Sequence, residues 1–202
     1  ADIKRRLARL RQEAERRAAP RVHTVHVEAE GAAQVVLLGP PNGGRSSLLA
    51  TLTRAEPAIA EYPFTTTRPQ PGMMPWEDVQ IQLVDLPPVT REHIDPWMPN
   101  VIQTADAALL VADAGARTFP GGLEEVRERL AEVHIHLVRH LSQDPDPRDT
   151  ELETLLVLTH ADSAPPEDLE VAEELFAEEL DVVRFDAARR TGVQALKSAL
   201  WR

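Results

Sequence analysis

The chain has 202 residues, no cysteine and a formal net charge of −11, and it is 43% hydrophobic but only 4% aromatic. This length suits one well-buried domain and leaves little for a second. No apolar stretch approaches the length of a membrane span or of a signal region. We therefore expect a soluble cytoplasmic protein with no membrane partner.

Charge is unevenly distributed along the chain. Residues 1–22 contain eight Lys or Arg against three Asp or Glu, a net charge of +5, which leaves −16 on the remaining 180 residues. An acidic body is a poor surface for nucleic acid, so we expect no DNA partner, whereas the basic segment could bind RNA or an acidic protein. A solvated amphipathic helix without a partner is the alternative for that segment.

The N-terminal segment is predicted to be helical. Apolar residues recur at helical spacing on one face of residues 2–18, namely Ile3, Leu7, Leu10 and Ala14. Pro20 ends this helix, and an extended stretch follows at 22–28. We assign residues 1–33 to the basic helix and its lead-in, and residues 34–202 to a single globular domain.

From residue 34 onward, β-type runs alternate with helical runs. The β-type runs are 34–38, 79–84, 107–112, 154–158 and 181–185, and the helical runs are 45–54, 121–141, 165–179 and 191–201. With the extended lead-in, this alternation predicts an α/β fold with a mostly parallel six-stranded sheet and helices on both faces. The run at 79–84 alternates apolar and polar residues, which indicates a strand with one less buried face at an edge of the sheet, and hence a mixed sheet. The acidic, proline-rich residues 142–153 are typical of a surface loop.

The most informative segment is the glycine-rich turn after the first β-type run. From Gly39 to Ser46 it reads Gly-Pro-Pro-Asn-Gly-Gly-Arg-Ser, one residue away from a phosphate-binding loop, in which lysine precedes the Ser or Thr. Backbone N–H groups and a helix N-terminus can converge there on phosphates, and the Ser46 hydroxyl can ligate Mg²⁺. Arg45 keeps the positive charge but replaces a compact ammonium with a planar fork. An ordinary turn rich in Gly and Pro is the alternative.

Further motifs follow the loop in a fixed order. The run Tyr-Pro-Phe-Thr-Thr-Thr-Arg-Pro at 62–69 lies in a connector, where a mobile hydroxyl could reach Mg²⁺ and a γ-phosphate. Asp85 ends a β-type run, which places its carboxylate at the carboxyl edge of the sheet beside the metal. After the run at 154–158, Asp162 could accept the N1–H and N2–H groups of guanine. The Asp-Ala-Ala turn at 186–188 could present backbone N–H groups to guanine O6.

With these motifs in this order, the chain resembles a P-loop GTPase of the translation-factor-related class, most closely the Obg/DRG-like branch. The resemblance covers roughly residues 2–202 and also rests on Pro-Gly-Met-Met at 71–74 and Ile-Gln-Leu-Val-Asp-Leu-Pro at 81–87. It implies a P-loop G domain that binds GTP or GDP with Mg²⁺ and acts as a regulatory switch. It also suggests association with the ribosome or RNA through the basic N-terminal helix.

The resemblance implies roles for individual positions. Nucleotide contacts are expected from the loop and from the two guanine-reading turns, that is, from Gly39, Asn42, Gly43, Gly44, Arg45, Ser46, Ser47, Thr159, His160, Asp162, Ala187 and Ala188. The expected Mg²⁺ ligands are Ser46, Thr66 and Asp85. Asn42, Arg45 and Thr66 are expected to carry hydrolysis, with Asn42 helping to coordinate a K⁺ ion that stands in for an arginine finger.

Several departures from the family pattern bear on chemistry. Arg45 replaces the loop lysine, and His160 stands where the guanine-reading motif has lysine. Pro88 replaces a glycine and has no N–H for the γ-phosphate, and Val89 stands where Ras-like proteins have a water-orienting glutamine. We therefore expect weakened GTP binding and slow hydrolysis. The alternative is a pseudo-GTPase, an interaction module that keeps the fold without productive hydrolysis. An ATP-using enzyme is disfavoured by Asp162.

Other candidate sites are weaker. His134, His136 and His140 fall in the predicted helix 121–141, and His136 and His140 have the i, i+4 spacing of metal ligands. No Cys or carboxylate completes this pair in the sequence, so we expect a solvated or partly packed helix there. The three tryptophans, Trp76, Trp97 and Trp201, are predicted to be packing residues rather than a binding platform.

Overall fold

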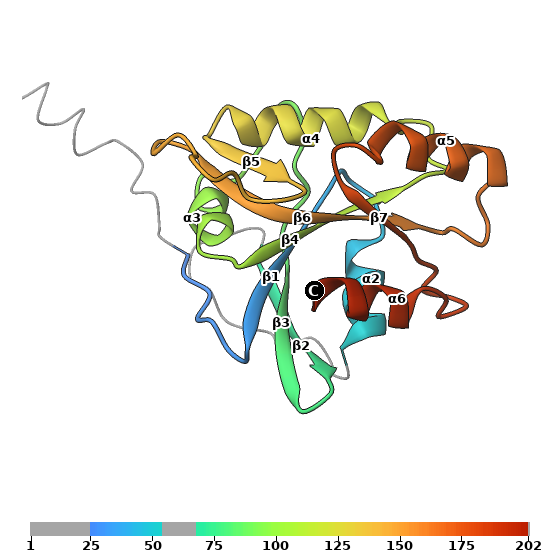
Figure 1. The fold of residues 1–202 in the computed structure, drawn as a ribbon, viewed down its shortest axis with the longest axis horizontal. Coiled ribbons are helices and arrows are strands. Elements are labelled where there is room, and N and C mark those ends of the chain that lie inside the picture. The colour runs from blue at the N-terminus through green and yellow to red at the C-terminus, as the bar shows by residue number, and fades with distance from the viewer. Residues whose placement is uncertain (1–24, 54–67, 202) are drawn as a thin grey trace, which may run out of the picture.

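The computed structural model describes residues 25–53 and 68–201. The predicted N-terminal helix, the basic segment and Thr66 lie outside the described residues. Within the described part, one sheet carries helices on both faces, as Figure 1 shows. The predicted α/β fold with a mostly parallel sheet is therefore confirmed. No helix in residues 25–53 and 68–201 is long and apolar enough to cross a bilayer.

The sheet contains seven strands. They are β1 (Ala33–Leu38), β2 (Gln70–Trp76), β3 (Val79–Asp85), β4 (Ala107–Asp113), β5 (Ile135–Val138), β6 (Thr150–Thr159) and β7 (Asp181–Arg184). The helices are α2 (Arg45–Leu52), α3 (Met98–Gln103), α4 (Gly121–Ala131), α5 (Pro166–Phe176) and α6 (Val193–Leu200). The strand order is β2-β3-β1-β4-β6-β5, and β7 also pairs with β6. Only β2, which pairs with β3, is antiparallel to its neighbour among these strands.

Parallel pairing brings the functional segments to one edge of the sheet. Strands β1, β3, β4, β6 and β7 all run in the same direction, so the turns that follow them emerge at the same edge. This carboxyl edge is where open α/β sheets bind ligands. The predicted phosphate loop, Asp85 and both predicted guanine-reading turns follow these strands.

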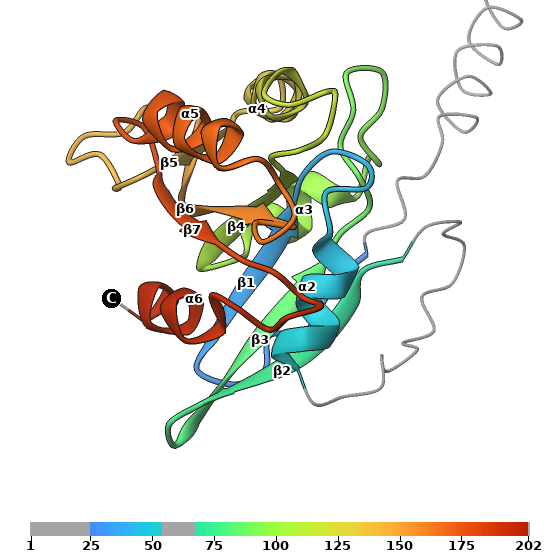
Figure 2. The ribbon, with the colours of Figure 1, turned by 90° about the vertical axis from the view of Figure 1, so that its right-hand side faces the viewer.

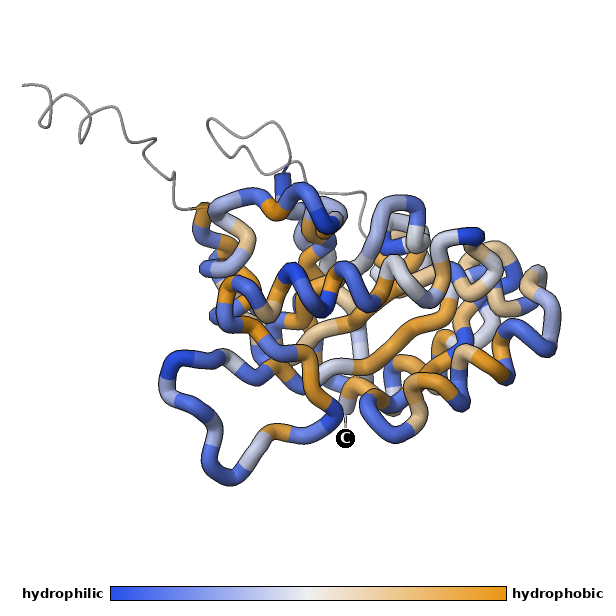
Figure 3. The backbone as a smooth tube through the Cα atoms, turned by 90° about the horizontal axis from the view of Figure 1, so that it is seen from above, coloured by the Kyte–Doolittle hydropathy of each residue, from blue (hydrophilic) through white to orange (hydrophobic). Residues whose placement is uncertain are grey.

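The core has one layer on each face of the sheet. Side chains of β1 alternate between the layers: Val36 and Leu38 pack with α3, α4 and α5, whereas Val35 and Leu37 pack with α2 and α6. Figure 2 shows these two sets of helices on opposite sides of the sheet. Figure 3 shows that the strand segments are mainly hydrophobic, while the outer loops are hydrophilic. A strand buried on both faces must be apolar throughout, which explains why the run at 34–38 predicts β1 so clearly.

Strand β3 is not an edge strand, and that prediction was wrong. Strand β2, within the proline-rich connector, covers its outer side. Of its two glutamines, Gln80 is exposed, whereas Gln82 is buried. Gln82 donates from Nε2 to the carbonyl of Glu28 and accepts a 2.7 Å hydrogen bond from Gln34. A buried amide with satisfied hydrogen bonds costs little. At Gln82, the polar position of the alternating pattern therefore reflects amide contacts with Glu28 and with Gln34 of β1 rather than a solvent-facing side.

The predicted helix over 121–141 was also wrong in its second half. Helix α4 ends at Ala131, and His134 has a left-handed backbone with φ +62. Residues 135–138 form β5, which pairs in parallel with the start of β6. The described part of the sheet has seven strands instead of the predicted six. Strands β2 and β5 are additional, whereas residues 25–30 of the lead-in form no strand.

Two smaller predictions also need correction. The predicted loop at 142–153 is shorter than expected, because β6 begins at Thr150. Trp97 is buried and Trp76 is partly buried, as the packing prediction requires, but Trp201 is half exposed and does not pack in the core.

Candidate functional site

The glycine-rich loop rests directly on the end of β4. Gly39 has φ +152, and a Cβ at this position would lie 2.2 Å from the carbonyl oxygen of Val111. A Cβ on Gly43 would lie 2.6 Å from the same oxygen. That oxygen belongs to the strand backbone and cannot move aside as a flexible side chain would. Both positions therefore require glycine, and the absence of side chains brings the loop backbone close to the sheet.

Helix α2 begins directly after this loop. Its N-cap, Gly44, has φ +89 and provides no side-chain hydrogen bond to the first turn. The first N–H groups of a helix have no partner within the helix, and together with the helix dipole they form a site for anions. Ser46 and Ser47 are exposed in this turn. The predicted phosphate contacts therefore lie where an anion can reach them.

A buried ion pair lies beside the loop. Arg45 and Asp85 are 9% and 7% exposed, and Nε of the arginine donates to Oδ1 of the carboxylate at 3.3 Å. The other carboxylate oxygen, Oδ2, accepts a 2.7 Å hydrogen bond from the Ser46 hydroxyl. Burial raises the pKa of the Asp85 carboxyl, and the contacts with Ser46 and Arg45 oppose that shift. Burial lowers the pKa of the Arg45 guanidinium, which attraction to Asp85 opposes.

The Arg45 side chain also binds the loop itself. Its Nη1 donates to the carbonyl oxygens of Gly39 at 2.5 Å and of Pro40 at 2.8 Å. The sequence predicted a phosphate contact for this guanidinium, whereas two of its three nitrogens face the protein. The third, Nη2, makes no hydrogen bond within the described part of the chain. It is the nitrogen that remains for a bound phosphate.

The residues present suit Mg²⁺. The Ser46 hydroxyl and the Asp85 carboxylate are hard oxygen donors held 2.7 Å apart, and Mg²⁺ prefers oxygen ligands from one or two such groups together with phosphates. A serine can donate its proton to the carboxylate while its lone pair faces the ion. The third predicted ligand, Thr66, lies outside the described residues.

The loop after β3 is anchored to the phosphate loop. Leu86 and Val89 are buried, and the Val89 N–H donates to the carbonyl of Gly39 at 3.2 Å. Pro88 is exposed and has no N–H to donate. Because the Val89 side chain lies in the core, neither residue offers a side-chain group that could orient a water molecule near a γ-phosphate.

Thr159 connects three segments at the sheet edge. It is 3% exposed, and its Oγ1 contacts the carbonyl oxygen of Gly43 at 2.9 Å and that of Ala112 at 3.2 Å. His160 follows with φ +54, and its Nδ1 lies 3.1 Å from Oδ2 of Asp113. The imidazole of His160, a predicted nucleotide contact, therefore lies beside the end of β4.

The two predicted guanine-reading turns lie side by side. The Ala161 N–H donates to the carbonyl of Phe185 at 3.3 Å, and Oδ2 of Asp162 accepts a 2.9 Å hydrogen bond from Thr191. Asp186 shapes the second turn by accepting from the Arg189 N–H. Ala187 is partly buried and Ala188 is exposed. The structure thus brings the Asp162 carboxylate close to the turn of Ala187 and Ala188, whose backbone amides are the other predicted guanine contacts.

Sequence reasoning missed two polar residues of this region, Asp113 and Thr191. Asp113 ends a strand at the same sheet edge as Asp85, so the same positional argument would have found it. Thr191 lies in no recognisable motif, and only the fold places its hydroxyl on Asp162.

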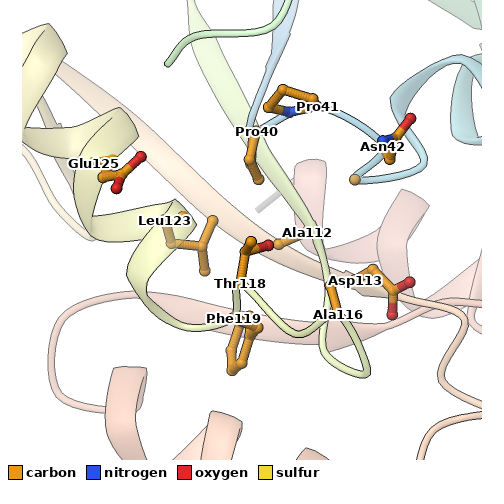
Figure 4. Close-up of a pocket in the computed structure, with 12 residues that line it drawn as sticks. Pro40, Pro41, Asn42, Ala112, Asp113, Ala116, Thr118, Phe119, Leu123 and Glu125 are labelled. Carbon is orange, nitrogen blue, oxygen red and sulfur yellow. The ribbon is translucent and has the colours of Figure 1, made fainter. Parts of the chain in front are cut away.

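A cavity of about 320 Å³ opens beside the loop. Figure 4 shows it between Pro40 and Pro41 on one side and Thr118, Phe119 and Leu123 on the other. Asn42, the predicted K⁺ ligand, is exposed at its rim with φ +60. Its amide is therefore accessible from the side of the loop that faces this cavity.

The three histidines at 134, 136 and 140, a weak metal candidate in the sequence, do not lie on a helix as expected. His136 lies on β5 rather than on a helix, and its Nε2 is 3.4 Å from Asp149. His140 instead contacts Glu153. Within the described ranges, no group of three or more His, Cys, Asp or Glu side chains could hold a metal ion.

Comparison with known proteins agrees with this geometry. The family model described as "50S ribosome-binding GTPase" matches residues 34–160. GTPase Obg of Deinococcus radiodurans is 30% identical over 188 residues, which is 88% of this chain and 40% of that protein. Mitochondrial ribosome-associated GTPase 2 of Homo sapiens is 41% identical over 68 residues, which is 33% of this chain and 17% of that protein.

A solved structure shares the fold. The G domain of the T. maritima FeoB iron transporter superposes with a TM-score of 0.63 at 22% identity, covering 84% of this chain and 96% of that one. At this identity the likeness concerns the fold alone. The chain itself spans 40% and 51% of the length of two Obg relatives that it matches.

The family model covers more than half of the 202 residues, and its match contains the loop, the Ser46–Asp85 contact and Thr159. The predicted resemblance is therefore confirmed: the chain belongs to the family of 50S ribosome-binding GTPases and is Obg-like within it.

Proposed function

We propose that this chain binds guanine nucleotide together with Mg²⁺ and acts as a regulatory switch that hydrolyses GTP slowly. The observation that carries this proposal is convergence at one sheet edge. The glycine loop, the Ser46–Asp85 contact and the joined turns of Asp162 and Ala187 come from four different strand ends and face one region.

The phosphates would lie over the loop. Gly39 and Gly43 bring its backbone against β4, and the uncapped first turn of α2 supplies N–H donors. Ser46 and Asp85, with Thr66, would hold Mg²⁺, which supplies positive charge to the phosphates when bound. Nη2 of Arg45 is left to donate to a phosphate oxygen.

The base would be read by the second pair of turns. A carboxylate at Asp162 accepts the N1–H and N2–H groups of guanine, whereas adenine has no N2 donor and presents N1 as an acceptor. Thr191 already donates to Oδ2 of this carboxylate and orients it. A mismatched polar group in such a site costs about 1–3 kcal/mol or more. The arrangement therefore favours guanine over adenine.

Slow hydrolysis follows from the loop after β3. Pro88 and the buried Val89 provide no side-chain group for a nucleophilic water. A K⁺ ion held beside the phosphates with help from the exposed Asn42 amide would supply transition-state charge stabilisation. We propose that turnover is slow and stimulated by potassium.

Ribosome or RNA association is the proposed cellular context. Its support is the description of the family and the names of the relatives, together with the +5 charge of residues 1–22. A basic segment binds phosphate backbones electrostatically. The acidic remainder of the chain argues against general nucleic-acid binding.

One observation favours the alternative, a pseudo-GTPase. Arg45 uses Nε and Nη1 on Asp85, Gly39 and Pro40. It therefore has fewer N–H donors left for a phosphate than the ammonium of a lysine would have. Such a chain would keep the fold and its interaction surfaces without productive hydrolysis.

Calorimetric titration tests the proposal and separates it from this alternative. GDP and GTP are expected to bind with Mg²⁺ present, and GDP at least ~10-fold more tightly than ADP. Binding of all nucleotides with equal affinity would contradict guanine recognition. Absence of any binding by a folded protein would support the pseudo-GTPase.

A further inference from the structure

The positive charge of the phosphate loop, the Arg45 guanidinium, is buried beside the Asp85 carboxylate. Arg45 is as deeply buried as Asp85, and its Nε contacts the carboxylate oxygen Oδ1 that Ser46 does not use. The carboxylate expected to serve Mg²⁺ therefore already has a cation beside it. That cation is part of the chain and is present whatever the magnesium concentration.

This contact has an electrostatic consequence for a metal. A buried carboxylate without a partner is strongly unfavourable, so in a site that relies on the ion, much of the gain from Mg²⁺ comes from neutralising that charge. Here the Arg45–Asp85 pair has no net charge. An incoming Mg²⁺ meets a carboxylate whose Oδ1 is occupied, and it also meets the repulsion of the neighbouring guanidinium.

The planar fork makes this arrangement possible. Nε and Nη1 hold Asp85 and the loop carbonyls of Gly39 and Pro40, while Nη2 stays without a partner in the described part of the chain. A lysine has one nitrogen on a flexible stem. It cannot contact the loop carbonyls, Asp85 and a phosphate with the same geometry.

We propose that Arg45 is the resident counter-cation of Asp85, and that guanine nucleotide binding by this chain depends only weakly on Mg²⁺. The inference rests on the proposed function, because it concerns nucleotide affinity. It assigns Arg45 a positioning role through Asp85 in addition to a phosphate contact through Nη2. The residue would thus determine the metal dependence of the site.

The test compares the full chain with its Arg45→Lys variant. The dissociation constant for GDP is measured in excess MgCl₂ and in excess EDTA at equal ionic strength. The wild-type constant is expected to change less than ~3-fold on removal of Mg²⁺, and that of the variant at least ~10-fold, since one charge-assisted contact separates them. Arg148→Lys is the matched control, because it makes the same change at the exposed Asp146–Arg148 pair.

If both proteins bind GDP and removal of Mg²⁺ weakens that binding by the same factor in wild type and in Arg45→Lys, the inference is overturned. The proposed function stays intact in that case. Failure of both proteins to bind GDP under either condition would overturn the proposed function, and the metal dependence with it.

A measurement without nucleotide tests the ion pair separately. Unfolding free energies are measured for wild type, Arg45→Lys, Asp85→Asn and the double variant. Arg45→Lys is expected to destabilise the wild-type background more than the Asp85→Asn background, in which only the contacts with the Gly39 and Pro40 carbonyls are lost. Strict additivity of the two substitutions would show that Arg45 does not neutralise Asp85, which would overturn the assignment even if nucleotide binds.

Discussion

Thr159 provides the sharpest test of how the sheet edge supports the loop. Thr159→Val keeps the shape of the side chain and removes the hydroxyl that contacts the carbonyl oxygens of Gly43 and Ala112. The side chain is 3% exposed, so water cannot fully replace the lost bond. Loss of a buried hydrogen bond that leaves its partner unsatisfied costs about 1–3 kcal/mol. For a chain of this size, each kcal/mol lowers the melting temperature by roughly 2–4 °C.

The same substitution is expected to weaken GDP binding, because the released Gly43 carbonyl lies in the middle of the phosphate loop. The affinity for GDP should fall by no more than about tenfold, because a single contact is removed. Thermal unfolding and calorimetric titration measure the two effects. Thr51→Val is the matched control, because the Thr51 hydroxyl donates to the Ser47 carbonyl in an exposed hydrogen bond within α2. Loss of such an exposed contact stays within about 0.5 kcal/mol. If both variants melt and bind alike, Thr159 does not support the loop.

Three further predictions concern the base, the monovalent cation and acid stability. Asp162→Ala should reduce the preference for GDP over ADP from at least ~10-fold toward unity, and an unchanged preference in competition titrations would remove this carboxylate from base recognition. GTP turnover, followed by phosphate release, should be faster in KCl than in NaCl at equal ionic strength, and Asn42→Ala should abolish the difference; identical rates in the two salts would argue against a K⁺ site. Arg184 lowers the pKa of Glu173 below its ordinary value of 4.5 through hydrogen bonds of 2.6 and 2.7 Å. The depressed pKa means that this stabilisation is present above pH 4.5 and is lost as pH falls through the lower native-state pKa. Glu173→Gln should therefore destabilise the protein by less than about 1 kcal/mol near neutrality and not at all in acid, as denaturant titrations at several pH values would show.

Much of the site could be predicted because its elements are local in sequence. Strands β1 and β4 are buried on both faces, so their runs are continuously apolar and recognisable without partners. The loop follows β1 directly, and Asp85 directly follows the β-type run 79–84. Parallel pairing then dictates that these strand ends meet at one edge, which is why the predicted loop, metal carboxylate and guanine-reading turns converge.

Strand β5 could not be predicted in this way. Leu137 also fits the helical spacing of Leu123, Val126, Leu130 and Val133 in the preceding stretch, so this local pattern favours continuing the helix over a four-residue strand. Pairing with β6 decided the outcome, and that pairing involves residues such as Thr150, which lies well beyond β5 in the chain. In β3, the same limit applies: whether Gln82 faces water or an amide partner depends on Gln34 and Glu28, on other segments.

The sequence by itself determined that a glycine-rich loop with an arginine in place of lysine lies at the edge of a parallel sheet. Only the tertiary structure decided what that arginine does. A long guanidinium side chain has many rotamers and no preferred direction in an isolated loop. Asp85, 40 residues away in sequence, selects one of them because burying either charge alone costs more than burying the pair.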